Sequence, residues 1–224
     1  MAFLNTLVTQ HFAPDALPAA VRAAIGKPLR RAAALTQLAL VGACASLPEA
    51  QRGQPTVLLW QSISGPRQET LNLLDEVCLG GGEPMPYDFL ATQPALAAAQ
   101  IQPFLPGLRS ATHLPLDNEL ASHWVLMLGL ACTWLDQGRC TQVICAQLDH
   151  WSDSASGQWL AVTDRPLETS LTSLQITDEN ATATSPDNAD FLAGLREWLN
   201  SGHSSHLTLQ SAAFPRLAVE FARL

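Results

Sequence analysis

Residues 107–150 decide the fold of this chain; they read GLRSATHLPLDNELASHWVLMLGLACTWLDQGRCTQVICAQLDH. The pattern predicts a strand over 110–116, a strongly apolar helix over 119–135 that stops before Gly138, and a second strand over 141–148. A strand that turns sharply into a buried helix is where α/β enzymes often expose a nucleophile. The unit therefore predicts an α/β protein and directs attention to the turn between its first strand and its helix.

The rest of the chain continues this alternation of strands and helices. We expect helices over 28–47, 68–79, 89–100 and 189–199, and strands over 56–61, 158–163 and 170–176. A polar run at 177–188, TDENATATSPDN, is the expected flexible loop. Alternation of this kind predicts a single α/β layered domain over residues 1–224 with a mostly parallel central sheet.

Composition excludes several classes of function. The chain has 224 residues, of which 47% are hydrophobic, so a substantial core is possible. Its formal net charge is −8, with only 12 Lys and Arg residues, which makes nucleic acid and anionic membrane surfaces poor partners. The one basic spot consists of Lys27, Arg30 and Arg31. No stretch is apolar for long enough to cross a bilayer, so we expect no membrane span.

The cysteines indicate a reducing compartment. Their number is odd and most lie in apolar runs, so they are expected to be buried thiols: Cys44, Cys78, Cys132, Cys140 and Cys145. No CxxC pair occurs, which argues against a zinc site. The first residues, MAFLNTLVTQHF, lack the features of a signal peptide. We therefore expect a cytoplasmic protein with no metal and no cofactor.

Four pieces of the sequence, taken in order, resemble the N-terminal half of β-ketoacyl synthases. They are SISGPRQETLNLL at 62–74, PMPYDFLATQPALAAAQ at 84–100, GLRSATHLPLDNELAS at 107–122 and LACTWLDQGRCTQVICAQLDH at 130–150. The preceding helix, KPLRRAAALTQLALVGACASL, is similar to that of the stand-alone synthase-like N-terminal domains that accompany aryl-polyene gene sets. The resemblance covers residues 27–163 and implies a thiolase-like, layered αβα half-domain.

The resemblance breaks at the nucleophile. Counting forward from Gly107 places the family's catalytic cysteine at Glu119, and counting backward from Cys140 places it at Ala121. Neither residue is a thiol, and a ketosynthase needs a thiolate to take the acyl chain from its carrier protein. The family's C-terminal half, which supplies the catalytic histidines, has no counterpart in the sequence either. We therefore expect no condensing activity from this chain alone.

The resemblance instead implies a role beside a catalytic partner, similar to that of a chain length factor. The partner would be a full-length ketosynthase of aryl-polyene or related fatty-acid-type biosynthesis, with the acyl carrier protein acting indirectly. The family segment that leans into the partner's acyl tunnel corresponds here to Tyr87, Phe89, Leu90, Thr92 and Leu96. The family strand that pairs across the dimer axis corresponds to Ser110, Ala111, Thr112, His113 and Leu114.

Interpretations from other classes stay open. One is a degenerate acyltransferase or hydrolase that uses Ser122 or Glu119, although a carboxylate at a helix start can simply stabilise the helix dipole. Another is a purely structural subunit of an unrelated complex. Phe89 could also be an ordinary core residue. Metal-ligand spacing is absent from His113, Asp149, His150 and Asp153, which favours chance clustering at strand ends over a metal or acid–base site.

Overall fold

The structure is a computed structural model that describes residues 1–80, 83–116, 123–177, 184–186, 191–202, 204–211, 214 and 216–224. The strands are β1 (Ala2–Phe12), β2 (Thr56–Ser62), β3 (Leu108–Pro115), β4 (Gln142–His150), β5 (Ala155–Thr163), β6 (Thr172–Thr177), β7 (Thr184–Pro186), β8 (His206–Gln210) and β9 (Ala218–Arg223). The helices are α1 (Leu17–Ile25), α2 (Ala34–Ser46), α3 (Arg67–Leu79), α4 (Pro86–Ala91), α5 (Ala97–Ile101), α6 (Trp124–Asp136) and α7 (Phe191–Ser201). Single 3-10 turns occur at η1 (Pro14–Ala16), η2 (Glu49–Gln51) and η3 (Pro94–Leu96).

The described strands form one nine-stranded sheet in the order β3-β2-β4-β5-β1-β6-β9-β8-β7. Only β2–β3, β2–β4 and β7–β8 are parallel pairs, and the five other pairs are antiparallel. The expectation of a mostly parallel sheet is therefore wrong. One reason is that no helix connects β4 to β5: a tight turn, in which the Trp151 N–H donates to the Ser154 carbonyl (2.8 Å), makes them a hairpin.

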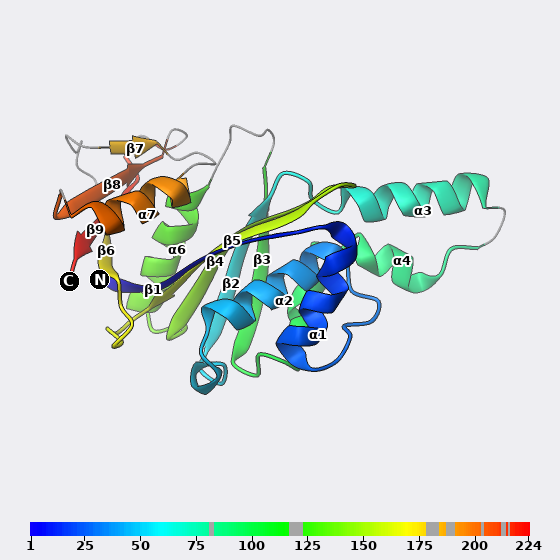
Figure 1. The fold of residues 1–224 in the computed structure, drawn as a ribbon, viewed down its shortest axis with the longest axis horizontal. Helices are drawn as coiled ribbons and strands as arrows, with labels where there is room; N and C mark the ends of the chain where they lie inside the picture. The colour runs from blue at the N-terminus through cyan, green and yellow to red at the C-terminus, as the bar shows by residue number, and fades with distance from the viewer. Residues whose placement is uncertain are drawn as a thin grey trace.

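The elements stack in four layers (Figure 1). Helices α1, α2 and α5 pack on one face of the sheet part formed by β3, β2, β4, β5 and β1. Helices α6 and α7 pack on its other face and separate it from the second part, formed by β6, β9, β8 and β7. Helix α6 contacts both parts and is buried along most of its length. The expected α/β layering is thus confirmed, and none of the described helices is long and apolar enough to cross a membrane.

Several predicted elements differ from the observed ones. The helix predicted over 28–47 begins only at Ala34, and the helix predicted over 89–100 is divided into α4, η3 and α5. The second break lies at Pro94, whose preceding residue Gln93 is extended (φ −108°, ψ 96°), as expected before proline. Within the loop predicted over 177–188, residues 184–186 form β7, while 178–183 and 187–188 lie outside the described residues.

Trp159 fixes how closely α2 approaches the sheet. Its fully buried indole lies against Gly42 of α2 and Gly157 of β5, and a Cβ added at Gly42 would come within 1.8 Å of the ring. Both neighbours must therefore be glycine for the ring to fit.

Gly42→Ala is expected to lower the free energy of unfolding by about 1–3 kcal/mol, because the added methyl group overpacks the core. Chemical denaturation followed by circular dichroism measures this. Gly129→Ala is the matched control in α6, since a Cβ there meets only Leu217, at 3.6 Å. The control gains helix propensity and should be neutral or stabilising. Equal stabilities of the two variants would contradict the packing argument.

Candidate functional site

The parallel strands β2, β3 and β4 end at the same edge of the sheet, and ligands of α/β proteins commonly bind at such an edge. The turn expected to carry the nucleophile position follows β3 at this edge. Glu119, Ala121 and Ser122 all lie outside the described residues. The described surroundings are the ends of β2 and β4, His113 on β3, and His123 just before α6.

Asp149 is the centre of a buried polar cluster at this edge. One of its carboxylate oxygens, Oδ1, accepts hydrogen bonds from the Ile63 N–H (2.7 Å), the Ser64 N–H (2.9 Å) and the Ser62 hydroxyl (3.2 Å). The Ser62 hydroxyl in turn accepts from the Gly65 N–H (2.8 Å). Three donors converge on one carboxylate, so Asp149 fixes the turn that leads from β2 into α3. The sequence interpretation, chance clustering, missed this structural role of Asp149. The feature of the sequence closest to it was the serine-rich turn at 62–65.

The start of α6 is also attached to β2. The His123 N–H donates to Gln61 Oε1 (2.7 Å), and the Gln61 amide Nε2 donates to Gln147 Oε1 of β4 (3.2 Å). Gln61 is fully buried, so these bonds are shielded from water. The two glutamines therefore hold the residue that precedes α6.

His113 does not join Asp149 in a catalytic pair. Its ring stacks on Trp60 with centroids 4.3 Å apart, and its Nε2 is buried without a hydrogen-bond partner. Burial lowers the pKa of His113, and the charge of Asp149 partly opposes this. The imidazole is therefore held in its neutral form. No group of three or more metal-ligating side chains occurs among the described residues.

The cysteines divide into two kinds. Cys44, Cys132, Cys140 and Cys145 are buried, as expected, and burial is the main cause that raises the pKa of each thiol, to about 12 for Cys132 and about 11 for Cys140. Thiols of this kind are poor nucleophiles because the thiolate is the reactive form. Cys78 differs from the expectation: it is exposed on α3.

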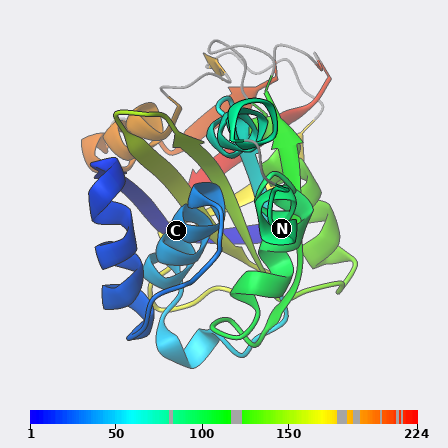
Figure 2. The same ribbon diagram turned by 90° about the vertical axis from the view of Figure 1, so that its right-hand side faces the viewer.

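Helices α3 and α4 form an arm, defined here as residues 67–80 and 83–91, that projects away from the layered body (Figures 1 and 2). None of the 13 residues of α3 is buried. Seven large apolar side chains of the arm are between 49% and 82% exposed: Leu71, Leu74, Val77, Leu79, Met85, Phe89 and Leu90. The amphipathic pattern predicted α3 correctly, but its apolar residues do not face a core of this chain.

The residues predicted to face a partner's tunnel do not share one environment. Phe89 and Leu90 are about half exposed, so Phe89 is not a core residue. Tyr87 lies under the Arg31 guanidinium, 5.0 Å from the ring centroid, and the Thr92 hydroxyl donates to the Phe89 carbonyl (2.8 Å). Leu96 is partly buried in η3.

Strand β3, which contains the predicted interface residues 110–114, is an edge strand of the sheet. The Leu116 N–H donates to the Ser62 carbonyl (3.0 Å), and Ser62 is opposite Pro115 in the parallel register. Because backbone groups alternate along a strand, the N–H groups of Thr112 and Leu114 face β2, and those of Ala111 and His113 face the open edge. The edge therefore offers backbone donors in a short row that ends at Pro115.

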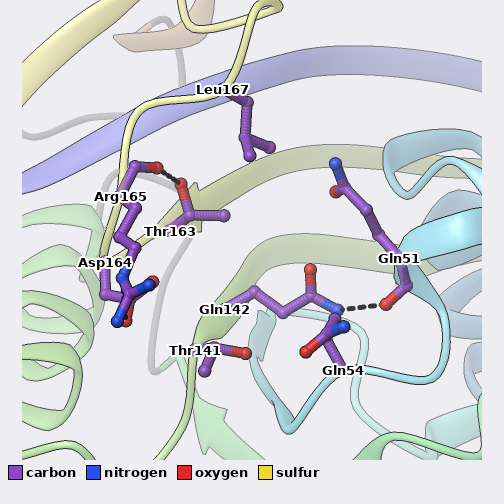
Figure 3. A pocket seen from close by; sticks show the side chains of 8 residues that line it. All are labelled: Gln51, Gln54, Thr141, Gln142, Thr163, Asp164, Arg165 and Leu167. Carbon is purple, nitrogen blue, oxygen red and sulfur yellow. Dashed lines mark hydrogen bonds and ion pairs between the residues drawn. The ribbon is translucent and has the colours of Figure 1, made fainter.

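A cavity of about 330 Å³ lies at the end of the strands away from the Asp149 cluster, where β4 begins and β5 ends (Figure 3). Its lining residues are Gln51, Gln54, Thr141, Gln142, Thr163, Asp164, Arg165 and Leu167. Gln142 Nε2 donates to the Gln51 carbonyl (2.9 Å), and the Thr163 hydroxyl donates to the Arg165 carbonyl (2.6 Å). These side chains thus hold neighbouring loops together, and no motif in the sequence indicated the cavity.

Comparison with known proteins identifies the fold. No family model and no curated protein matches the sequence. Among solved structures, a ketosynthase (ApeO) in complex with its chain length factor (ApeC) from Xenorhabdus doucetiae matches with 13% identity over 99% of each chain and a TM-score of 0.60. The ishigamide ketosynthase/chain length factor matches with 12% identity over 91% of this chain and 84% of that chain, with a TM-score of 0.63.

A third structure has the same architecture. It is AntDE:AntF, a type II PKS acyl-carrier protein in complex with its ketosynthase, which matches with 13% identity over 100% of this chain and 99% of that chain and a TM-score of 0.59. The chain therefore has the thiolase-like fold of the ketosynthases. At these identities the similarity establishes the fold alone.

Proposed function

We propose that the chain is a non-catalytic, chain-length-factor-like subunit that pairs with a full-length ketosynthase and helps to shape its acyl tunnel. The biosynthesis would be of the polyene or fatty-acid type, with aryl polyenes as the specific case. The acyl carrier protein would act through the ketosynthase. The observation that carries the proposal is the arm, whose apolar side chains are not covered by the described part of this chain.

The arm concentrates exposed apolar surface in one place. Seven of the twelve large hydrophobic side chains that are exposed among the described residues belong to it. Scattered exposed apolar residues are ordinary, whereas a contiguous group marks a binding surface. The arm begins at the end of β2, next to the open edge of β3, so one partner could cover both.

The thiolate that condensation needs has no candidate in this part of the fold. Residues 117–122 contain no cysteine, and the described buried thiols have raised pKa values. Cys78 is exposed, but it lies in the last turn of α3, whereas the Asp149 cluster holds the turn that precedes this helix. Condensation would therefore need a partner that brings its own thiolate, while a hydrolase or acyltransferase that uses Ser122 or Glu119 stays the alternative.

Phe89→Ala is expected to make the heterodimer release longer acyl products while the complex stays intact. A rigid ring at the end of a tunnel stops elongation, and a pocket discriminates each methylene group by about 1–3 kcal/mol. The measurement is mass spectrometry of products made by the ketosynthase co-purified with either form of the chain.

The matched control is Phe214→Ala, because Phe214 is exposed to a similar extent (48%, against 49% for Phe89) but lies in the segment between β8 and β9. It should leave the product length unchanged. Since neither ring is buried in the core, both variants should keep nearly the full stability of the parent. If Phe89→Ala leaves the product length unchanged in a complex of normal composition, Phe89 does not shape the tunnel. A purely structural subunit would then be the favoured interpretation.

A further inference from the structure

The arm is positioned by polar contacts. Helix α3 has no buried residue, so apolar packing against the body cannot set its direction. At its base, the Arg67 N–H donates to the Ser64 carbonyl (3.3 Å), and the Arg67 guanidinium lies 5.2 Å from the centroid of the Trp151 ring. Both contacts are made by Arg67 alone, and further contacts are needed to fix the angle of a helix this long.

Glu69 supplies one such contact. Its Oε1 accepts a hydrogen bond from the Ala34 N–H (3.0 Å), which belongs to the first turn of α2. The N-cap residue of α2, Ala33, has no side chain that could cap the helix. A carboxylate from α3 therefore satisfies a backbone donor that α2 leaves open, and its negative charge suits the helix N-terminus.

Arg31 supplies the other contact, on α4. Its backbone is left-handed (φ +59°), a conformation that is unusual for a residue other than glycine. In this conformation its guanidinium covers the Tyr87 ring of α4 at 5.0 Å, and its carbonyl accepts a hydrogen bond from Gln100 Nε2 (3.3 Å). Backbone strain persists where the surroundings hold it in place, and it often marks a functional position.

We propose that Arg31 and Glu69 are positioning residues that tie the arm to the loop between α1 and α2 (residues 26–33) and to the first residue of α2, so that this segment sets the direction of the arm. Among the described contacts, Glu69 joins α3 to the start of α2, and Arg31 joins α4 to the loop. Both ties end within four residues of each other, at Arg31 and Ala34. A change in the conformation of the loop is therefore transmitted to Phe89 and Leu90 through α4.

A spin-label measurement on the chain alone tests the positioning role. Cys78 is the one exposed cysteine, so a nitroxide can be attached to it selectively, and Arg139→Cys provides a second label on the exposed turn before β4. The distance distribution between the labels should be narrow in the parent. It should broaden and shift in the Arg31→Ala, Glu69→Ala double variant, because both ties are lost.

Two sets of controls isolate the effect. Arg30→Ala with Glu76→Ala makes the same change of charge on the same two segments, and it should leave the distribution narrow. Arg31→Lys with Glu69→Gln keeps a cation over the ring and an oxygen acceptor for the Ala34 N–H, and it should restore most of the parental distribution. A distribution in the Arg31→Ala, Glu69→Ala variant as narrow as in the parent would overturn the proposal.

The consequence for product length rests on the proposed function and is measured separately. In the heterodimer, the double variant should broaden the distribution of acyl chain lengths while the two subunits still co-purify. If the parent chain does not co-purify with the ketosynthase, the proposed function is wrong, but the positioning role is not affected. A broadened distance distribution together with unchanged acyl chain lengths would show that the direction of the arm does not control product length.

Discussion

Asp149→Ala is expected to lower the free energy of unfolding by at least about 3 kcal/mol, since the Asp149 carboxylate accepts three hydrogen bonds, two of them buried and one partly buried. A hydrogen bond to a charged group contributes roughly 1.5–3 kcal/mol, and removing the acceptor leaves the N–H groups of Ile63 and Ser64 without it. These donors are in the turn from β2 to α3. The variant should therefore also loosen the base of the arm.

Chemical denaturation measures the loss of stability, and amide hydrogen exchange at residues 62–65 measures the loosening of the turn. Asp149→Asn keeps an oxygen acceptor at the same place and should be milder than Asp149→Ala. Asp153→Ala is the matched control, because Asp153 is exposed in the turn between β4 and β5 and bonds only to the adjacent Ser154 hydroxyl among the described contacts. A loss of stability no larger in Asp149→Ala than in this control would show that the cluster is not structural.

Ala111→Pro is expected to abolish co-purification with the ketosynthase without unfolding the chain. The Ala111 N–H faces the open edge of β3, so proline removes a donor to the partner strand and leaves the β2–β3 bonds in place. Proline removes one hydrogen-bond donor from the interface, and its ring adds bulk at the edge where the partner strand would pair. Both effects oppose addition of a strand. Co-expression followed by affinity purification and native mass spectrometry measures the ratio of subunits.

Thr112→Pro is the informative comparison. Thr112 is also one of the predicted interface residues, but its N–H faces β2. Proline at this position should therefore destabilise the sheet itself. Ala111→Val, which keeps the N–H and suits a strand, should retain the partner. Normal subunit ratios in Ala111→Pro would show that β3 is not the interface strand.

The elements of this fold that depend on local signals could be predicted from the sequence. Strands β2, β3 and β4 follow from apolar runs bounded by turn residues, and α3 follows from its spacing of leucines. The start of α2 could not be predicted, because helix propensity favours residues 29–33, and the contact between Arg31 and the Tyr87 ring is tertiary. The break at Pro94 had a local signal, namely the restriction that proline imposes on the residue before it.

Local sequence patterns do not determine the relative direction of the strands or the hydrogen bonds of the site. The alternation of strands and helices suggested a parallel sheet, whereas the hairpin from β4 to β5 and the pairing of β1 with β5 made it mostly antiparallel. Apolar spacing along α3 predicted a face packed against a core, whereas the structure leaves that face exposed. The acceptor role of Asp149 requires the ends of β2 and β4 to be neighbours, which no local pattern reports.

Intact-protein mass spectrometry of the reconstituted heterodimer, after exposure to acyl carrier protein loaded with a short acyl chain, tests the central claim most directly. Each subunit is weighed separately, so the measurement shows which one takes the acyl group. The acyl mass is expected on the ketosynthase, and this chain should keep its unmodified mass, alone or in the complex. A covalent acyl adduct on this chain would show that the chain is itself an enzyme and not a non-catalytic subunit.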